Sequence, residues 1–114
     1  MAITRAAENL AVTFEVHRVI AKDHPALAGH FPGNPIVPGV LILDEVMQAA
    51  EQWRGQLRLK SVVSVKFTCP LKPGIAFSIK LHEEDHSHIA FECWLGGTRL
   101  ASGRLAVEPE AGGP

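Results

Sequence analysis

HFPGNPIVPGVLILDEVMQAA, residues 30–50, is the stretch of this 114-residue sequence that decides its fold. Three prolines stiffen its first part, namely Pro32, Pro35 and Pro38. With the neighbouring glycines they predict a loop without regular structure over residues 21–39. The following residues are good helix formers, and neither glycine nor proline occurs among them before Gly55. Because proline suits a helix start and glycine suits a helix end, we predict a helix over residues 40–53.

The early turns of this helix are apolar on nearly every side. The apolar residues of these turns are Val40, Leu41, Ile42, Leu43, Val46 and Met47. A helix that is apolar on most of its faces is normally buried. We therefore expect it to form the centre of the hydrophobic core.

The second half of the chain alternates apolar and polar residues, which is typical of β-strands. The alternation predicts strands over residues 12–20, 59–69, 75–81, 89–95 and 98–107. Hairpin turns are expected at HEEDHSH and at Gly96-Gly97, and a β-bulge is expected near Ser102-Gly103, where the alternation slips. Because one helix cannot cover both faces of a sheet, we predict an α+β fold: a curved antiparallel sheet wrapped around one long central helix.

Composition limits the class of protein. The chain is 46% hydrophobic and 20% charged with a net charge of −1, so we expect one globular domain over residues 1–114 with an ordered core over about 11–108. The balanced charge argues against binding to nucleic acid or to a membrane surface. Two cysteines make no disulfide framework, and no apolar run is long enough for a membrane span. We expect a cytoplasmic protein.

Asp44 is a candidate functional residue because it interrupts the apolar helix. A carboxylate in an apolar stripe is costly unless it is paired or used in chemistry. Gln48 lies one turn further along, where its amide can orient the carboxylate. The alternative is that Asp44 lies at the edge of the stripe and faces water beside Glu45.

His30 is a second candidate, in the stiff loop before the helix. A fixed loop is what the positioning of a catalytic base requires. At the helix start Gly39 offers an unhindered N–H at the positive end of the helix dipole, which suits a carbonyl oxygen that gains negative charge. The alternative is that His30 is an ordinary loop histidine with no catalytic role.

These residues resemble the active-site segment of the 3-hydroxyacyl-[acyl-carrier-protein] dehydratases, which have the hotdog fold. The positions that match the family pattern are His30, Phe31, Pro32, Gly33, Pro35, Pro38, Gly39, Leu41, Asp44 and Gln48. VKFTCPLKPG, residues 65–74, is similar to the family's strand that ends in a Phe-x-x-Pro, x-x-Pro-Gly corner. In its short connections the chain resembles the compact dehydratases of aryl-polyene pigment pathways.

The resemblance implies a role for each matching residue. His30 would be the catalytic base and Asp44 the catalytic carboxylate, in the Asp form rather than the commoner Glu form. Gly39 would donate its N–H to the thioester carbonyl. Gln48 would support Asp44, and the residues expected to contact the substrate are Phe31, Val37 and Pro38. We expect Asp44 to be buried, and neither a metal ion nor an organic cofactor is expected.

The implied function is dehydration of 3-hydroxyacyl thioesters on acyl carrier protein, in fatty-acid or polyene biosynthesis. In the family the histidine and the carboxylate of one site come from different subunits, so a homodimer is expected and a heterodimer with a related subunit stays open. Two alternatives are a hotdog acyl thioesterase and a noncatalytic partner subunit. The HFPGNP loop argues against the thioesterase, and the presence of both His30 and Asp44 argues against the noncatalytic subunit.

Other polar clusters give weaker signals. The histidines and carboxylates of residues 82–88 imitate a metal site, but we interpret them as a polar hairpin tip. A set of cations is a candidate docking surface for an acidic carrier protein: Arg54, Arg58, Lys60, Lys66, Lys72 and Arg104. The alternative for each of them is an ordinary charge in contact with water. We expect Trp94 and Arg99 to pair across the Gly96-Gly97 turn, and Cys69 and Cys93 to be small apolar fillers.

Overall fold

The structure is a computed structural model that describes residues 13–27 and 36–110. Its elements are β1 (Thr13–Arg18), a 3-10 turn η1 (Pro25–Leu27), α2 (Gly39–Arg54), β2 (Leu57–Phe67), β3 (Phe77–Asp85), β4 (His88–Leu95) and β5 (Thr98–Pro109). The helix and the five predicted strands are therefore all present, with ends shifted by a few residues. The short turn η1 corrects the expectation that residues 21–39 lack regular structure.

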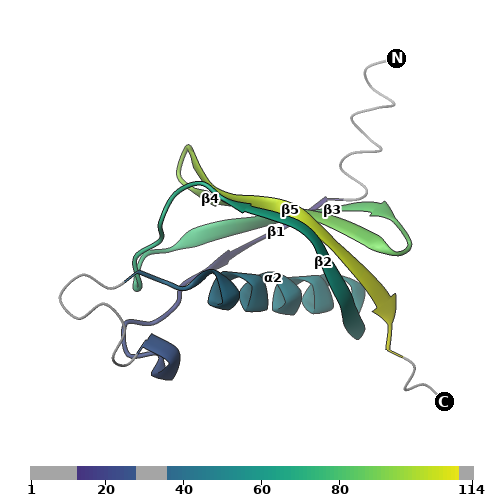
Figure 1. Ribbon diagram of the computed structural model, residues 1–114, viewed down its shortest axis with the longest axis horizontal. Coiled ribbons are helices and arrows are strands. Elements are labelled where there is room, and N and C mark those ends of the chain that lie inside the picture. Colours follow the sequence, from purple (N-terminus) through teal and green to yellow (C-terminus); the bar gives the residue numbers. More distant parts are fainter. Residues whose placement is uncertain (1–12, 28–35, 111–114) are drawn as a thin grey trace.

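The strands form one antiparallel sheet in the order β1-β3-β4-β5-β2. Figure 1 shows the sheet arching over α2, with β2 and β5 bending past the C-terminal end of the helix. This arrangement is the predicted curved sheet around one helix, and it confirms the α+β class. Strands β1 and β2 are the two edges, so the backbone groups on the outer side of each have no neighbouring strand among the described residues.

The ends of α2 follow the sequence signals. Pro38 is the N-cap residue, with extended φ and ψ of −61° and 144°. Gly55 ends the helix at a φ of 89°, and its N–H donates to Glu51 O at 2.8 Å. A side chain at a φ of this kind is strained, so glycine is the residue that lets the chain leave the helix here.

The predicted bulge at Ser102-Gly103 is in the wrong place. Cys93 pairs with Ala101 and Trp94 pairs with Arg99, so the extra residue of β5 is Leu100. Gly103 has a different role, because a Cβ added there would lie 2.2 Å from Ser64 O and 2.8 Å from the Phe91 ring. The glycine lets β2 and an aromatic ring approach the backbone of β5 closely.

The core lies between the sheet and one side of α2. The helix contributes Ile42, Val46, Ala49 and Ala50, and the sheet contributes residues that include Phe77, Ile79, Leu81, Ile89, Phe91, Leu105 and Val107. The expectation that the early helix is buried on all sides is wrong for Val40, which is 69% exposed. A single sheet covers only one side of a helix, so no strand of the described residues packs on the opposite side of α2.

Strand β2 is unusually exposed for an apolar strand. Only Leu57 is buried, and the exposed apolar residues of the strand are Leu59, Val62, Val63, Val65 and Phe67. The pairing of β2 with β5 shifts by one residue at Lys60 and again at Val63, and such bulges bend a strand. An exposed apolar edge strand is a surface on which another chain can pair.

Candidate active site

The first turn of α2 opens onto an apolar cavity of about 420 Å³. The residues that line it are Ile36, Val37, Gly39, Ile42, Phe67, Thr68, Cys69, Pro70 and Leu71. The cavity is therefore made by the helix start, by the end of β2 and by the loop that follows β2. Its volume falls within the range of pockets that hold small organic ligands.

Val37 is fixed at the cavity wall by its backbone. Its N–H donates to Leu71 O at 2.8 Å, and its side chain is buried. Pro38 follows as the half-buried N-cap of α2, and Gly39 is the first helical residue. The structure thus places two of the predicted substrate and carbonyl residues, Val37 and Gly39, at the cavity, and puts Pro38 between them in the chain.

Gln48 and Asp44 interact as the sequence spacing predicts. The Gln48 amide donates from Nε2 to Asp44 Oδ2 at 2.8 Å. Both residues are exposed in the single chain, so the expectation that Asp44 is buried is wrong for one chain alone. Val40, Asp44 and Gln48 follow one another at intervals of four residues, and together they form the open side of α2.

Glu45 points to a different part of the molecule from Asp44. Its carboxylate Oε1 lies 3.2 Å from Nε of Arg18, at the end of β1, and its side chain is only 21% exposed. Nη2 of Arg18 also donates to Gln52 Oε1 at 2.7 Å. These contacts tie α2 to β1 and leave Asp44 as the carboxylate of this pair that faces the open side.

His30 and Phe31 lie outside the described residues. The chain leads into this segment from Leu27, which is buried, and leaves it at Ile36 in the cavity wall.

The residues from Phe67 to Leu71 line the cavity, although no site role is predicted for them from the sequence. The signal for them was present, because the motif VKFTCPLKPG contains all five.

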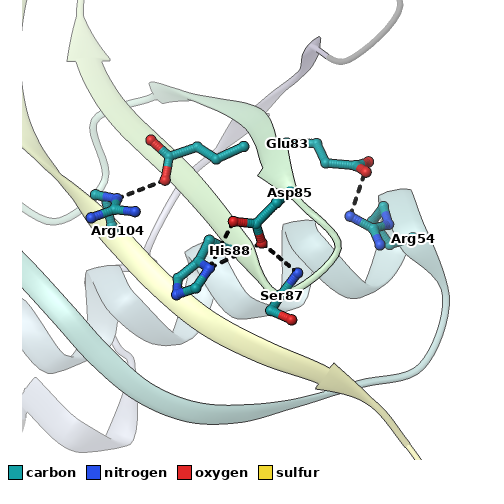
Figure 2. A network of polar contacts seen from close by, with 7 residues as sticks. Arg54, Glu83, Asp85, Ser87, His88 and Arg104 are labelled. Carbon is teal, nitrogen blue, oxygen red and sulfur yellow. Dashed lines mark hydrogen bonds and ion pairs between the residues drawn. The ribbon is translucent and has the colours of Figure 1, made fainter.

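Several acidic side chains of the β3–β4 hairpin make polar contacts, partly within the hairpin and partly with α2 and β5 (Figure 2). Glu83 lies 3.0 Å from Arg54 at the end of α2, and Glu84 lies 2.6 Å from Arg104 of β5. Asp85 accepts from the Ser87 N–H at 2.7 Å and lies 3.0 Å from His88 Nδ1. Among the described residues no group of three or more His, Cys, Asp or Glu side chains is arranged to hold a metal ion.

The two cysteines are free thiols in the described structure. Cys93 is buried in the sheet, and burial raises the pKa of its thiol to about 12. A thiol with so high a pKa is unreactive at neutral pH, which agrees with its interpretation as an apolar filler. Trp94 and Arg99 pair as predicted, with the guanidinium 5.4 Å from the ring centre.

Comparison with known proteins gives one family and a consistent set of relatives. Residues 4–104 match the family described as ApeI-like, ApeI dehydratase. The 3-hydroxyacyl-[acyl-carrier-protein] dehydratase FabZ of Zymomonas mobilis is 32% identical over 107 residues, covering 82% of this chain and 64% of that enzyme. FabZ of Ehrlichia chaffeensis is 29% identical over 113 residues, covering 90% of this chain and 78% of that enzyme. The chain is thus shorter than these relatives, and spans less than two thirds of the first.

A solved structure has the same architecture. The dehydratase heterocomplex ApeI:P from Xenorhabdus doucetiae contains a chain that superposes with a TM-score of 0.74 at 26% identity, covering 84% of this chain and 87% of that one. This likeness confirms the predicted hotdog fold. Within the described residues no helix is long and apolar enough to cross a membrane.

Proposed function

Because the chain belongs to the ApeI-like dehydratase family, we propose that it removes water from 3-hydroxyacyl thioesters of acyl carrier protein to give trans-2-enoyl thioesters. The observation that carries this proposal is the placement of Gly39 and Asp44 on one helix, with Gly39 at an apolar cavity and Asp44 oriented by Gln48. The cavity suits the acyl chain of the substrate. Gly39 suits the thioester oxygen, and Asp44 suits the hydroxyl group that leaves.

The reaction needs a base for the α-proton, an acid for the departing hydroxyl and a donor for the thioester oxygen. Neutral His30 takes the proton from C2. Asp44 protonates the hydroxyl at C3, which leaves as water as the C2=C3 double bond forms. The Gly39 N–H, at the positive end of the α2 dipole, stabilises the negative charge on the thioester oxygen. This scheme uses no cofactor.

The site is completed by a second copy of the chain, with His30 and Asp44 of each site supplied by different subunits. Two observations support this assembly: Asp44 and Val40 face outward from the single chain, and the edge strand β2 is apolar and exposed. Pairing of β2 with its counterpart would give hydrogen-bond partners to the outer backbone groups of both edge strands. A carboxylate that is exposed in one chain would then be enclosed in the dimer.

A related subunit is the alternative partner. The structural relative from Xenorhabdus doucetiae is described as a heterocomplex. The homodimer is the simpler assembly, because it needs only residues that this chain contains. Light scattering of the purified protein tests it, since a dimer has twice the mass of the 12.3 kDa chain. A monomer that turns over substrate would contradict the shared site.

The cations available to an acidic carrier protein are fewer than the sequence suggests. Three of the six candidates are in ion pairs: Arg54 with Glu83, Arg58 with Glu108, and Arg104 with Glu84. Lys66 and Lys72, in contrast, are exposed and flank the Phe67–Leu71 segment of the cavity wall. We therefore propose that the carrier docks beside this segment. From the family match we also propose a role in fatty-acid or polyene biosynthesis, in the cytoplasm.

The proposed reaction is tested with 3-hydroxyacyl thioesters by following the absorbance of the enoyl product and the exchange of the α-proton with deuterated water. His30→Ala should lower kcat by about 10²–10⁴, the usual effect of removing a positioned acid–base group, and should suppress the exchange. His86→Ala, at the exposed hairpin tip, is the control. Release of free thiol without an enoyl product would instead indicate a thioesterase.

A further inference from the structure

Phe67 touches the start of α2 more closely than any side chain at position 39 would allow. A Cβ built on Gly39 would lie 2.5 Å from Cζ of the Phe67 ring, and 2.8 and 3.0 Å from Cε2 and Cε1. Real Cβ atoms do not approach other atoms so closely. The tip of the ring therefore rests directly on the Cα of Gly39, and glycine is the residue that makes this contact possible.

The backbone around Phe67 is firmly held. Phe67 is the last residue of β2 and pairs with Ala101 of β5. The next two residues, Thr68 and Cys69, both donate their N–H groups to Leu100 O, at 2.8 and 3.3 Å. The Thr68 hydroxyl also donates to Arg99 O at 2.7 Å. The ring position is thus set by the end of the sheet and not by a free loop.

The ring itself is only partly covered. Phe67 is 46% exposed, although it lines the cavity together with Gly39 and Ile42. Moving the rest of an aromatic ring's surface out of water lowers the free energy of the system. The uncovered part of the ring therefore offers an apolar contact to a ligand beside the first turn of the helix.

We infer that Phe67 is a specificity-determining residue. Its ring limits the size of the substituents that an acyl chain can have next to the reacting carbons. This inference rests on the proposed function, in which the thioester oxygen accepts from the Gly39 N–H. Carbons 2 to 4 of the acyl chain then lie beside the ring that abuts Gly39. An unbranched chain passes the ring, whereas a methyl branch at C4 meets it.

Two isomeric substrates test the inference without changing carbon number. These are the 3-hydroxyhexanoyl and 3-hydroxy-4-methylpentanoyl thioesters of carrier protein, which undergo the same elimination and differ in branching at C4. Wild-type enzyme should favour the unbranched isomer in kcat/KM. Phe67→Ala should raise the ratio of branched to unbranched kcat/KM by about tenfold, which is a typical effect of one methyl group in an apolar site. Phe67→Leu, which keeps an apolar side chain at the strand end, should give an intermediate ratio.

Val65→Ala is the matched control, because Val65 lies on the same strand two residues earlier, is 38% exposed and does not line the cavity. It should leave the ratio unchanged even if it weakens the association of chains. Equal loss of activity on both isomers in the two Phe67 variants, or an unchanged ratio, would overturn the role of Phe67 while leaving the dehydratase intact. A wild-type protein inactive on both isomers and on unbranched 3-hydroxyacyl thioesters of greater length would overturn the proposed function, and this inference with it.

Discussion

The Gln48 side chain donates to Asp44 Oδ2 at 2.8 Å, so the amide holds the carboxylate from one helical turn away. The neighbouring carboxylate, Glu45, is held by Arg18 on another side of the helix. Adjacent residues of an α-helix point about 100° apart, and the two carboxylates therefore serve different parts of the molecule.

This difference predicts unequal effects of two similar substitutions. Asp44→Asn should lower kcat by about 10²–10⁴, because an amide cannot give a proton to the leaving hydroxyl. The fold should persist, since the asparagine oxygen still accepts from Gln48. Glu45→Gln should keep activity within about twofold and cost about 1 kcal/mol of stability or less through its ion pair with Arg18. Steady-state kinetics and thermal unfolding of both variants measure this, and equal losses of activity would contradict the assignment.

The close contacts of Gly103 predict that a substitution there lowers the stability of the fold, although the residue lies far from the site. Gly103→Ala should lower the free energy of unfolding by about 1–3 kcal/mol, because the new methyl group would overlap Ser64 O and the Phe91 ring. Gly97→Ala is the matched control, since a Cβ there meets nothing within 4 Å. Chemical denaturation of the two variants gives the comparison. Equal stability of both would show that β2 and β5 are not as close as described.

Asp85 predicts a dependence of stability on pH. Its pKa is lowered, first by the hydrogen bond from the Ser87 N–H and then by the one from His88. A carboxyl whose folded pKa is lowered contributes stability above its unfolded pKa of about 3.9, and loses it as the pH falls through the folded value. The difference in Tm between wild type and Asp85→Asn should shrink as the pH falls from about 5 to below about 4.

Asp23→Asn, an exposed aspartate on another turn, is the control for this pH series. Its difference from wild type should change less over the same range. A difference for Asp85→Asn that grows as the pH falls from about 5 to below about 4 would contradict the stabilising contacts of Asp85.

The carrier surface predicts an effect on one substrate form only. Lys72→Glu should raise KM for the carrier-bound thioester by about tenfold, because it places a like charge against an acidic partner. The KM for a small thioester without the carrier should not change. Lys80→Glu is the control, since Lys80 lies over the Trp94 ring on the outer face of the sheet. Equal effects on both substrate forms would place the carrier elsewhere.

The sequence was sufficient to predict the helix, the strands and their general arrangement. Alternation and helix-breaking residues are local signals, so the helix, its stop at Gly55 and all five strands could be predicted. The bulge at Leu100 could not, because it depends on which residues face each other across β4 and β5. The contact between Phe67 and Gly39 was also out of reach, since it joins positions 28 residues apart through the curvature of β2.

The burial of the site residues was the other feature that could not be predicted from the sequence. Periodicity identified an apolar helix, and it could not tell that one sheet would leave Val40 and Asp44 exposed within the single chain. That outcome depends on how many layers the fold has. The exposed side of α2 and the apolar edge β2 therefore became evidence for a second subunit only once the structure had placed them.

The shared site is tested most directly by mixing two inactive variants. His30→Ala and Asp44→Asn homodimers should each be nearly inactive. Unfolding and refolding them together in equal amounts should restore about a quarter of the wild-type activity, because half of the dimers are mixed and each mixed dimer has one intact site. Dehydration at this level is expected if the two catalytic groups come from different subunits. A mixture that forms mixed dimers yet stays as inactive as its components would contradict the shared site.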